Sequence, residues 1–357
     1  MRESSFSEKQ KDIIWDACIR NTKGEVIEAP QATFGIPVAD THCHLDMLHH
    51  PGLALARAAS HNVNFIVSIT DPTEDPLYTY NNLSQWQKTA NDLLKEWHNE
   101  TNDPHCEPGK KAPHVRLAVG CHPHNASKYT AEIERQLIIC AQQPITAAIG
   151  EIGLDYHYDN SPRETQRKVF MRQLQIANKL MLPVVLHLRE AHDDGLSILK
   201  EHGEHPAGIL LHCYNLDYDT LQPFLDLGIH VAFGGPLTFK KADEVRDAAA
   251  RCPVERMVTE TDAPFMAPEP VRGVVCGPEH TVFTAAALAM ARGLINKETQ
   301  IRTANEVTTK HHGARQGGSL EAAMKQAARQ EATEREAIAF LTEIYANALR
   351  FFDRNRE

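Results

Sequence analysis

Eight short runs rich in β-branched and aliphatic residues recur along this chain and constrain its fold more than any other feature. Segments with helical spacing separate most of them. Strands that alternate with helices and are apolar on both faces indicate a parallel sheet covered on both sides. Eight such units predict one α/β domain, a single (β/α)8 TIM barrel, with its chemistry at the C-terminal strand ends. The predicted strands are Val38–Thr41, Val63–Thr70, Val115–Gly120, Ala147–Gly153, Val184–Leu188, Ile209–Cys213, Ile229–Gly234 and Arg256–Thr261.

One helix start is clearly marked in the sequence. Ser161 is a capping residue, Pro162 suits the first helical position, and Glu164 completes a capping box. Apolar residues then repeat at helical intervals until Pro183, which precedes the next predicted strand. We therefore predict a capped helix between the fourth and fifth strands.

Three regions exceed a minimal barrel. Residues 1–36 form a predicted N-terminal extension, in which Gly24–Ile27 is expected to belong to a small hairpin. Residues 37–357 form the predicted barrel, with insertions at about 81–113 and 303–336. The first insertion is expected to hold a helix followed by a loop, and the second a Gly-Gly-Ser turn followed by an exposed, alanine-rich, charged helix.

Composition limits the partners and the cellular location. No apolar run is long enough to span a membrane, and the first residues lack the apolar core of a signal peptide, so we predict a cytoplasmic protein. The eight cysteines include no Cys-x-x-Cys pair, which predicts reduced thiols. A net charge of −10 argues against a broad basic groove for long nucleic acids but does not exclude a phosphate substrate. No required protein partner is evident.

His42 and His44 begin a set of metal-compatible residues. On an extended strand alternate side chains share a face, so both imidazoles can reach one ion. Later predicted strands also end in metal-compatible side chains. Four histidines and two carboxylates would hold two divalent metal ions; histidine-rich ligation suits Zn²⁺, and the carboxylates also admit Mn²⁺ or Mg²⁺. The predicted ligands are His42, His44, Glu151, His187, His212 and Asp262.

Further polar residues lie where a substrate would contact the site. Glu151 stands between two glycines inside an apolar run and is the natural bridge between two ions. Arg189 shares a strand face with His187 and can present its guanidinium to a phosphate. Tyr214 is expected to repeat this arrangement beside His212.

The loop after the third predicted strand offers two more imidazoles at the same mouth. His122 and His124 are expected to bind phosphate or steer the leaving group, and a proline-shaped turn with exposed histidines is the structural alternative. Arg272, in the loop after the last predicted strand, is also predicted to contact the substrate.

Together these motifs resemble the TatD-type metal-dependent deoxyribonucleases, a branch of the amidohydrolase-like barrels. The resemblance covers roughly residues 38–290 and the last dozen. It is carried by Asp40–Asp46, Gly120–His124, Gly150–Tyr156, Pro183–His187, Leu211–Tyr214, Glu260–Pro264 and Asn347–Phe352. One departure is Cys276, which stands two residues before Pro278 where such proteins commonly carry asparagine.

The resemblance implies a 3′-to-5′ exonuclease or a related phosphodiesterase. It places His42, His44, Glu151 and Asp262 around one ion, and it places His187 and His212 with the bridging Glu151 around the second. Asp262 and Glu151 are then the expected catalytic residues, with Asp262 orienting the attacking water and taking its proton. His122 and Arg189 match positions near the substrate phosphate. The expected substrate is DNA, single-stranded or at its 3′ ends, or another small phosphate ester.

Other functions are compatible with parts of this pattern. A metal-dependent amidohydrolase, such as a D-aminoacyl-tRNA deacylase, can use the same ligands, because metals polarise carbonyl and phosphoryl groups alike. A barrel reused as a non-enzymatic interaction module would lack ligands, and all six are present. Binding of nucleic acid without cleavage would need basic or stacking surfaces, of which the charge balance gives no sign.

Overall fold

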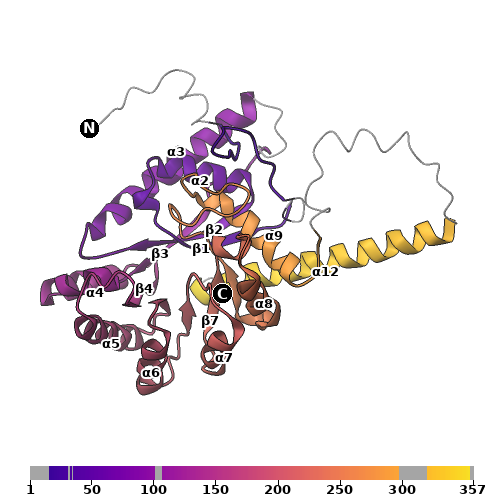
Figure 1. Cartoon of the computed structure of the whole chain (residues 1–357). Helices are drawn as coiled ribbons and strands as arrows, with labels where there is room; N and C mark the ends of the chain where they lie inside the picture. The colour runs from indigo at the N-terminus through magenta and orange to yellow at the C-terminus, as the bar shows by residue number, and fades with distance from the viewer. Residues whose placement is uncertain (1–15, 31–32, 34, 101–106, 297–319, 354–357) are drawn as a thin grey trace.

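The computed structural model describes residues 16–30, 33, 35–100, 107–296 and 320–353. Within them eight parallel strands pair in sequential order and curve into a barrel, as predicted (Figure 1). Helices follow the strands and cover the outside of the sheet (Figure 1). The strands are β1 (Val38–Cys43), β2 (Val63–Thr70), β3 (His114–Val119), β4 (Thr146–Asp155), β5 (Val184–Arg189), β6 (Ile209–Leu211), β7 (His230–Phe233) and β8 (Met257–Thr259).

The outer helices supply the crossovers between parallel strands. They are α2 (Pro51–Ser60), α3 (Pro76–Glu100), α4 (Ala131–Ala141), α5 (Arg163–Leu180), α6 (His192–His202), α7 (Tyr218–Asp226), α8 (Asp243–Arg251), α9 (Thr281–Ala291) and α12 (Leu320–Phe352). Residues 81–100, expected to begin an insertion, lie in α3, which is the crossover between β2 and β3. The extra length there is therefore partly a long regular helix.

Side chains and loop backbone join β1 to the end of β8. Thr41 Oγ1 donates to the carbonyl of Thr259 at 3.0 Å, and Thr259 Oγ1 donates to the carbonyl of Ala39 at 2.7 Å. Beyond the strand end, the amide of Asp262 donates to the carbonyl of His42 at 2.9 Å. These bonds bring the first and last predicted metal ligands of the sequence together.

The start of α5 differs from the predicted capping box. The helix begins at Arg163, Pro162 is its N-cap, and no side chain caps it. The hydroxyl of Ser161 instead donates to the carbonyl of His124 at 2.8 Å. The prediction of a capping box is wrong because this serine is used to fasten the loop after β3, a tertiary contact that the local sequence does not reveal.

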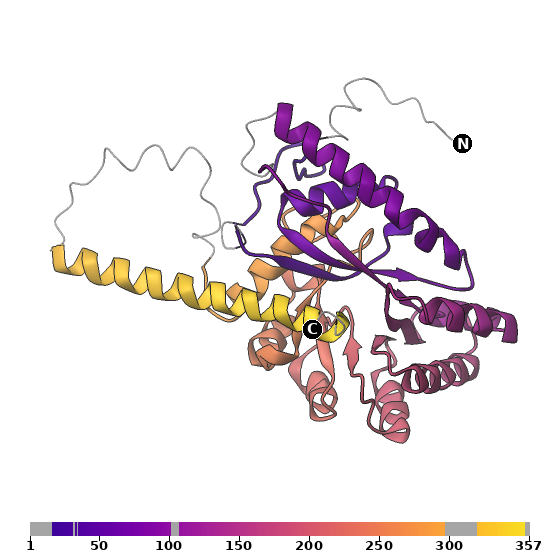
Figure 2. The ribbon, with the colours of Figure 1, turned by 180° about the vertical axis from the view of Figure 1, so that it is seen from behind.

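The C-terminal helix closes the N-terminal end of the barrel. Ala348, Phe351 and Phe352 are buried in one apolar cluster with barrel residues such as Phe65 and Val185. Figures 1 and 2 show α12 in yellow, with its C-terminal end against the barrel and its N-terminal part extending away from it. The Gly-Gly-Ser turn predicted before this helix lies outside the described residues.

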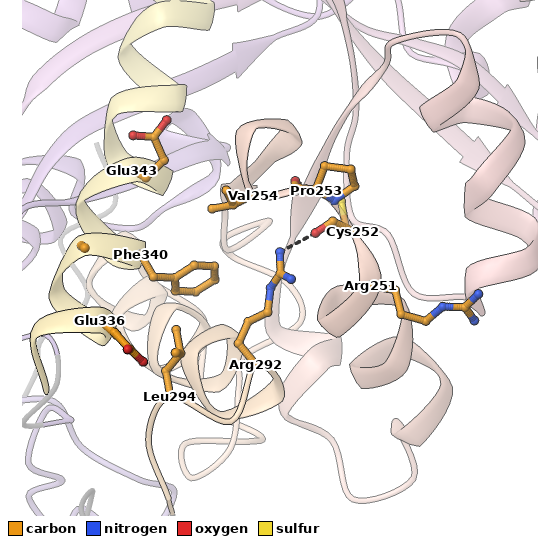
Figure 3. Close-up of a pocket in the computed structure, with 10 residues that line it drawn as sticks. Arg251, Cys252, Pro253, Val254, Arg292, Leu294, Glu336, Phe340 and Glu343 are labelled. Atoms are coloured by element: carbon orange, nitrogen blue, oxygen red, sulfur yellow. Dashed lines mark hydrogen bonds between the residues drawn. The ribbon is translucent and has the colours of Figure 1, made fainter. Parts of the chain in front are cut away.

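A hollow lies where α12 passes the ends of α8 and α9 (Figure 3). Phe340 from α12 and Arg292 from the end of α9 border it, and Arg292 Nη1 donates to the carbonyl of Ala250 at 2.7 Å. Arg292 also donates to the carbonyl of Cys252, the bond drawn in Figure 3. Arg292 therefore binds backbone carbonyls. None of the candidate metal-binding groups of the described residues lies in this hollow.

The described part of the N-terminal extension packs on the barrel. Ala17 and Ile19 are buried in one cluster with residues of α2, and an antiparallel bridge joins Arg20 to Val26. None of the helices in the described ranges is long and apolar enough to cross a membrane. The cysteines of these ranges are all free thiols, as predicted.

Candidate metal centre

Glu151 stands at the centre of the site and presents its two carboxylate oxygens in different directions. Oε2 lies 3.4 Å from Nε2 of His42 and 3.9 Å from Nε2 of His44. Oε1 lies 2.6 Å from Nδ1 of His187 and 2.8 Å from Nε2 of His212. The side chain is almost fully buried. One carboxylate therefore faces two pairs of imidazoles, which is the arrangement that a bridging ligand requires.

Asp262 completes the group on the β1 side. Its Oδ1 lies 3.7 Å from Nε2 of His44 and 3.8 Å from Nε2 of His42. The residue follows β8 and has a positive φ of 62°. All six predicted ligands thus converge at the C-terminal ends of β1, β4, β5, β6 and β8, although they come from distant parts of the chain.

The donor set fits divalent cations. Three groups of potential ligands have all their donor atoms within 4.8 Å of one another: His42, His44 and Asp262; His42, Glu151 and His212; and His122, Glu151 and His187. Nε2 of His42 is buried without a hydrogen-bond partner, which costs about 1–3 kcal/mol unless another group satisfies it. The rings of His42 and His212 stack at 3.9 Å. A cation beside these rings would satisfy the orphaned nitrogen.

The ionisation of these groups suits metal ligation. Burial opposes the charge on Glu151, but His212, His122 and His42 hold its pKa well below the ordinary value. Burial likewise opposes ionisation of Asp262, while its contacts with His44 and His42 keep its pKa low. Both carboxylates are therefore ionised at neutral pH. Burial lowers the pKa of His42, which favours a neutral ring with a free lone pair.

His122 lies close to the ligands, with a defined tautomer. Its Nδ1 accepts the amide hydrogen of His124 at 3.2 Å, and its Nε2 lies 3.4 Å from Oε1 of Glu151. Burial lowers the pKa of His122 to about 4. The neutral ring therefore carries its proton on Nε2 and acts as a hydrogen-bond donor rather than as a cation.

Asp155 lies against two histidines of the site and was not among the residues predicted from the sequence. Its Oδ2 lies 2.9 Å from Nε2 of His124 and 3.3 Å from Nε2 of His187. A carboxylate on the far nitrogen of a metal-binding histidine fixes the ring orientation and raises its basicity. The signal was present, because Asp155 follows Glu151 by four residues on the same strand and so shares its face.

Two more buried acidic residues fasten the segments that carry the predicted ligands, and they too were not predicted from the sequence. Asp40 accepts the amide of Thr261 at 2.9 Å and its hydroxyl at 2.7 Å, which ties β1 to the end of β8. Glu260 accepts the amide of Cys213 at 2.6 Å and lies 3.7 Å from Nδ1 of His212. Asp40 precedes His42 by two residues, so strand alternation could have suggested it.

The structure contradicts the predicted position of Tyr214. β6 ends at Leu211, and Cys213 has a positive φ of 49°, so strand alternation is lost before Tyr214. The side chain is buried in the core, and its hydroxyl donates to the carbonyl of Asp217 at 2.5 Å. The prediction that Tyr214 lies beside His212 at the substrate mouth is wrong.

The two predicted arginines are exposed and stack on aromatic rings. The guanidinium of Arg189 lies 4.7 Å from the ring centre of Tyr158, and that of Arg272 lies 3.7 Å from the ring centre of Phe239. His124 contacts the same Tyr158 ring at 5.3 Å. Arg189, His124 and Tyr158 therefore form one cluster beside His187, a predicted ligand.

Comparison with known proteins agrees with this geometry. The profile of the family described as "TatD related DNase" matches residues 39–310. The chain is 33% identical over 276 residues to the metal-dependent hydrolase YcfH of Escherichia coli K12, which covers 75% of this chain and 93% of that protein. It is 35% identical over 244 residues to the human 3′-5′ RNA nuclease TATDN2, which covers 68% of this chain and 30% of that protein.

A solved structure shows the same fold. YJJV, a TatD homolog from Escherichia coli K12, superposes with a TM-score of 0.60 at 23% sequence identity, over 88% of this chain and 98% of that one. The sequence match over most of the barrel agrees with the resemblance drawn from the motifs. The chain therefore belongs to the TatD family of metal-dependent hydrolases.

Proposed function

We propose that this chain is a phosphodiesterase that removes nucleotides from the 3′ end of single-stranded nucleic acid, with DNA as the expected substrate. The observation that carries the proposal is Glu151, whose two oxygens face separate groups of ligands. A carboxylate in this position suits a pair of ions, the usual equipment for hydrolysing a phosphodiester. The direction of cleavage is supported by the similarity to the human nuclease.

The proposed ligands divide around Glu151. His42, His44 and Asp262 would hold one cation, and His187 and His212 would hold the other. Divalent cations bound here would supply Lewis-acid chemistry, which lowers the pKa of a bound water to about 7 and offsets charge on phosphoryl oxygens. The histidine-rich set favours Zn²⁺, and Mn²⁺ or Mg²⁺ are the other candidates.

The proposed proton acceptor is Asp262. Its low pKa keeps it ionised at neutral pH, and its partly exposed side chain lies beside His44. From there it can orient an attacking water and take its proton. A general base of this kind typically contributes about 10²–10⁴-fold to the rate.

Residues on the opposite side of the cluster would handle the phosphate. Neutral His122 can donate its Nε2 hydrogen to a non-bridging oxygen, and exposed Arg189 can present its guanidinium to the same group. His124 is held by Asp155 and extends this polar surface. Arg272 stacks on Phe239. It is proposed only as a contact to the part of the substrate that lies away from the scissile phosphate.

The direct test is cleavage of short single-stranded DNA and RNA labelled at either end. The protein is first stripped with a chelator, and Zn²⁺, Mn²⁺ and Mg²⁺ are then returned separately. We expect metal-dependent release of a 3′-terminal label as a mononucleotide and a ladder from a 5′ label. A charged D-aminoacyl-tRNA is assayed in parallel. Deacylation of that tRNA without cleavage of any oligonucleotide would identify an amidohydrolase instead.

A further inference from the structure

An exposed phenylalanine borders the metal centre on the β8 side. Phe265 follows Asp262 by three residues, and its amide donates to the Asp262 carbonyl at 2.8 Å. Its ring meets the ring of the ligand His44 at 6.1 Å in an edge-on arrangement, yet 51% of the residue is exposed. A half-exposed aromatic ring fixed next to a metal ligand offers an apolar face to whatever enters the site.

A second exposed aromatic ring borders the centre on the β4 side. The amide of Tyr158 donates to Oδ1 of Asp155 at 2.8 Å, and 54% of the residue is exposed. Its ring carries the guanidinium of Arg189 at 4.7 Å and touches His124 at 5.3 Å. Three aromatic side chains of the described residues are largely exposed, the third being Tyr78, so two of the three border this site.

The order of the strands places these rings on opposite sides of the mouth. In the sequential barrel, β4 and β5 lie across from β8 and β1. Tyr158 follows β4 and contacts the end of β5, whereas Phe265 follows β8 and contacts His44 after β1. The six metal ligands lie between the two sides. A nucleotide chain with its scissile phosphate at the ligands would therefore have a ring available to a base on each side.

We propose that Phe265 and Tyr158 are base-stacking residues that select single-stranded nucleotide chains over small phosphate esters. This inference rests on the proposed nuclease function and names the groups that would recognise its substrate. With a net charge of −10 the protein gains little long-range attraction for a polyanion. Stacking of unpaired bases on aromatic rings supplies affinity without a basic groove, and paired bases offer no free face for it.

The test compares two substrates in wild type and variants. One is a short single-stranded oligonucleotide, and the other is the same oligonucleotide with its 3′-terminal bases removed. Phe265→Leu and Tyr158→Leu keep apolar bulk but remove the ring. We expect each to lower kcat/KM about 5- to 150-fold on the intact substrate, the range for loss of one stacked base. On the abasic substrate each variant should match wild type.

Conservative variants and a distant control sharpen the comparison. Phe265→Trp and Tyr158→Phe retain a ring and should retain the preference for the intact substrate. Leu227→Ala removes a similarly exposed apolar side chain at the C-terminal end of α7, far from the mouth, and should change neither rate. All variants alter exposed positions, and their thermal unfolding is recorded to verify the fold.

The outcomes separate this inference from the function on which it rests. An equal loss on both substrates would mean that the rings act by holding Asp262 or His124, and it would overturn the stacking role. If wild type cleaves neither substrate, the nuclease proposal fails. In that case the stacking role is tested by fluorescence anisotropy of the two oligonucleotides with the metal-stripped protein. Tighter binding of the intact oligonucleotide that is lost in Phe265→Leu supports stacking. Equal binding of the intact and abasic oligonucleotides refutes it.

Discussion

The Oδ2 atom of Asp155 lies 3.3 Å from Nε2 of His187. Glu151 lies against the other nitrogen of the same ring, with Oε1 at 2.6 Å from Nδ1. With its proton directed to Asp155, His187 presents the Nδ1 lone pair to the centre of the ligand cluster. Asp155 is itself clamped from α5, because Gln166 accepts the Asp155 amide at 2.8 Å and donates to its carbonyl at 3.0 Å.

Asp155→Asn should therefore weaken metal binding without removing a ligand. The amide keeps the shape but loses the charge that makes His187 a better donor, and changes of this kind typically cost about 10- to 100-fold in metal affinity. Titration calorimetry on the metal-stripped protein measures the effect. Asp226→Asn, an exposed change on α7, is the matched control and should bind metal as wild type does. Unaltered affinity in the Asp155 variant would contradict the positioning role.

Asp262→Asn should leave a folded protein with little turnover. The amide cannot take a proton from water, so we expect kcat to fall by about 10²–10⁴-fold. Because the ionised carboxylate also faces His42 and His44, weaker binding of one metal ion is expected as well. Rates are compared at saturating metal, and circular dichroism verifies the fold. Wild-type activity in this variant would refute the assignment of the base.

Removal of metal should destabilise the protein as well as inactivate it. The ring nitrogens of His42 are buried without hydrogen-bond partners. Oε1 of the buried Glu151 lies against Nε2 of His212. Bound cations would satisfy these groups. Ligand at about 100 times its Kd stabilises a folded state by about 2.7 kcal/mol per site. We expect thermal unfolding to shift upward when metal is returned, with two ions per chain by elemental analysis. Glu151→Gln should lower that stoichiometry.

Much of the fold, and the convergence of the six predicted ligands, could be predicted from strand alternation. Each predicted ligand lies within an apolar run of the sequence or within three residues of its end, and such runs are typical of buried strands. Tyr214 shows the limit, since the left-handed backbone at Cys213 reverses the alternation and nothing in a cysteine signals it. The role of Ser161 in fastening the His124 loop was equally hidden, because a capping signature is local and the contact is tertiary.

Acid should weaken an ion pair on the outer helices. Arg172 Nε donates to Glu134 Oε2 at 2.9 Å, joining α5 to α4, and this hydrogen bond lowers the pKa of Glu134. A carboxylate whose pKa is lower in the folded than in the unfolded state stabilises the fold at a pH above the unfolded-state pKa, which is about 4.3 for glutamate. That stabilisation is lost as the pH falls through the folded-state pKa. Arg172→Gln should cost about 0.2–1 kcal/mol at neutral pH, since the pair is partly exposed. Urea unfolding at neutral and acidic pH should show that the free energies of unfolding of wild type and Arg172→Gln converge in acid. A difference that does not change with pH would contradict this account.

The end of α12 should matter more to stability than its distance from the site suggests. Phe352 is 2% exposed and fills the N-terminal end of the barrel beside Phe351. Phe352→Ala removes a buried ring and leaves a cavity, so we expect a loss of about 3–5 kcal/mol in the free energy of unfolding. Ile338→Ala on the same helix is the control, because Ile338 is 50% exposed and its loss should stay within about 0.5 kcal/mol. Denaturant unfolding measures both. Equal effects of the two substitutions would show that α12 does not close this end of the barrel. The expected difference would show that the last residues of the helix belong to the scaffold of the barrel on which the predicted ligands lie.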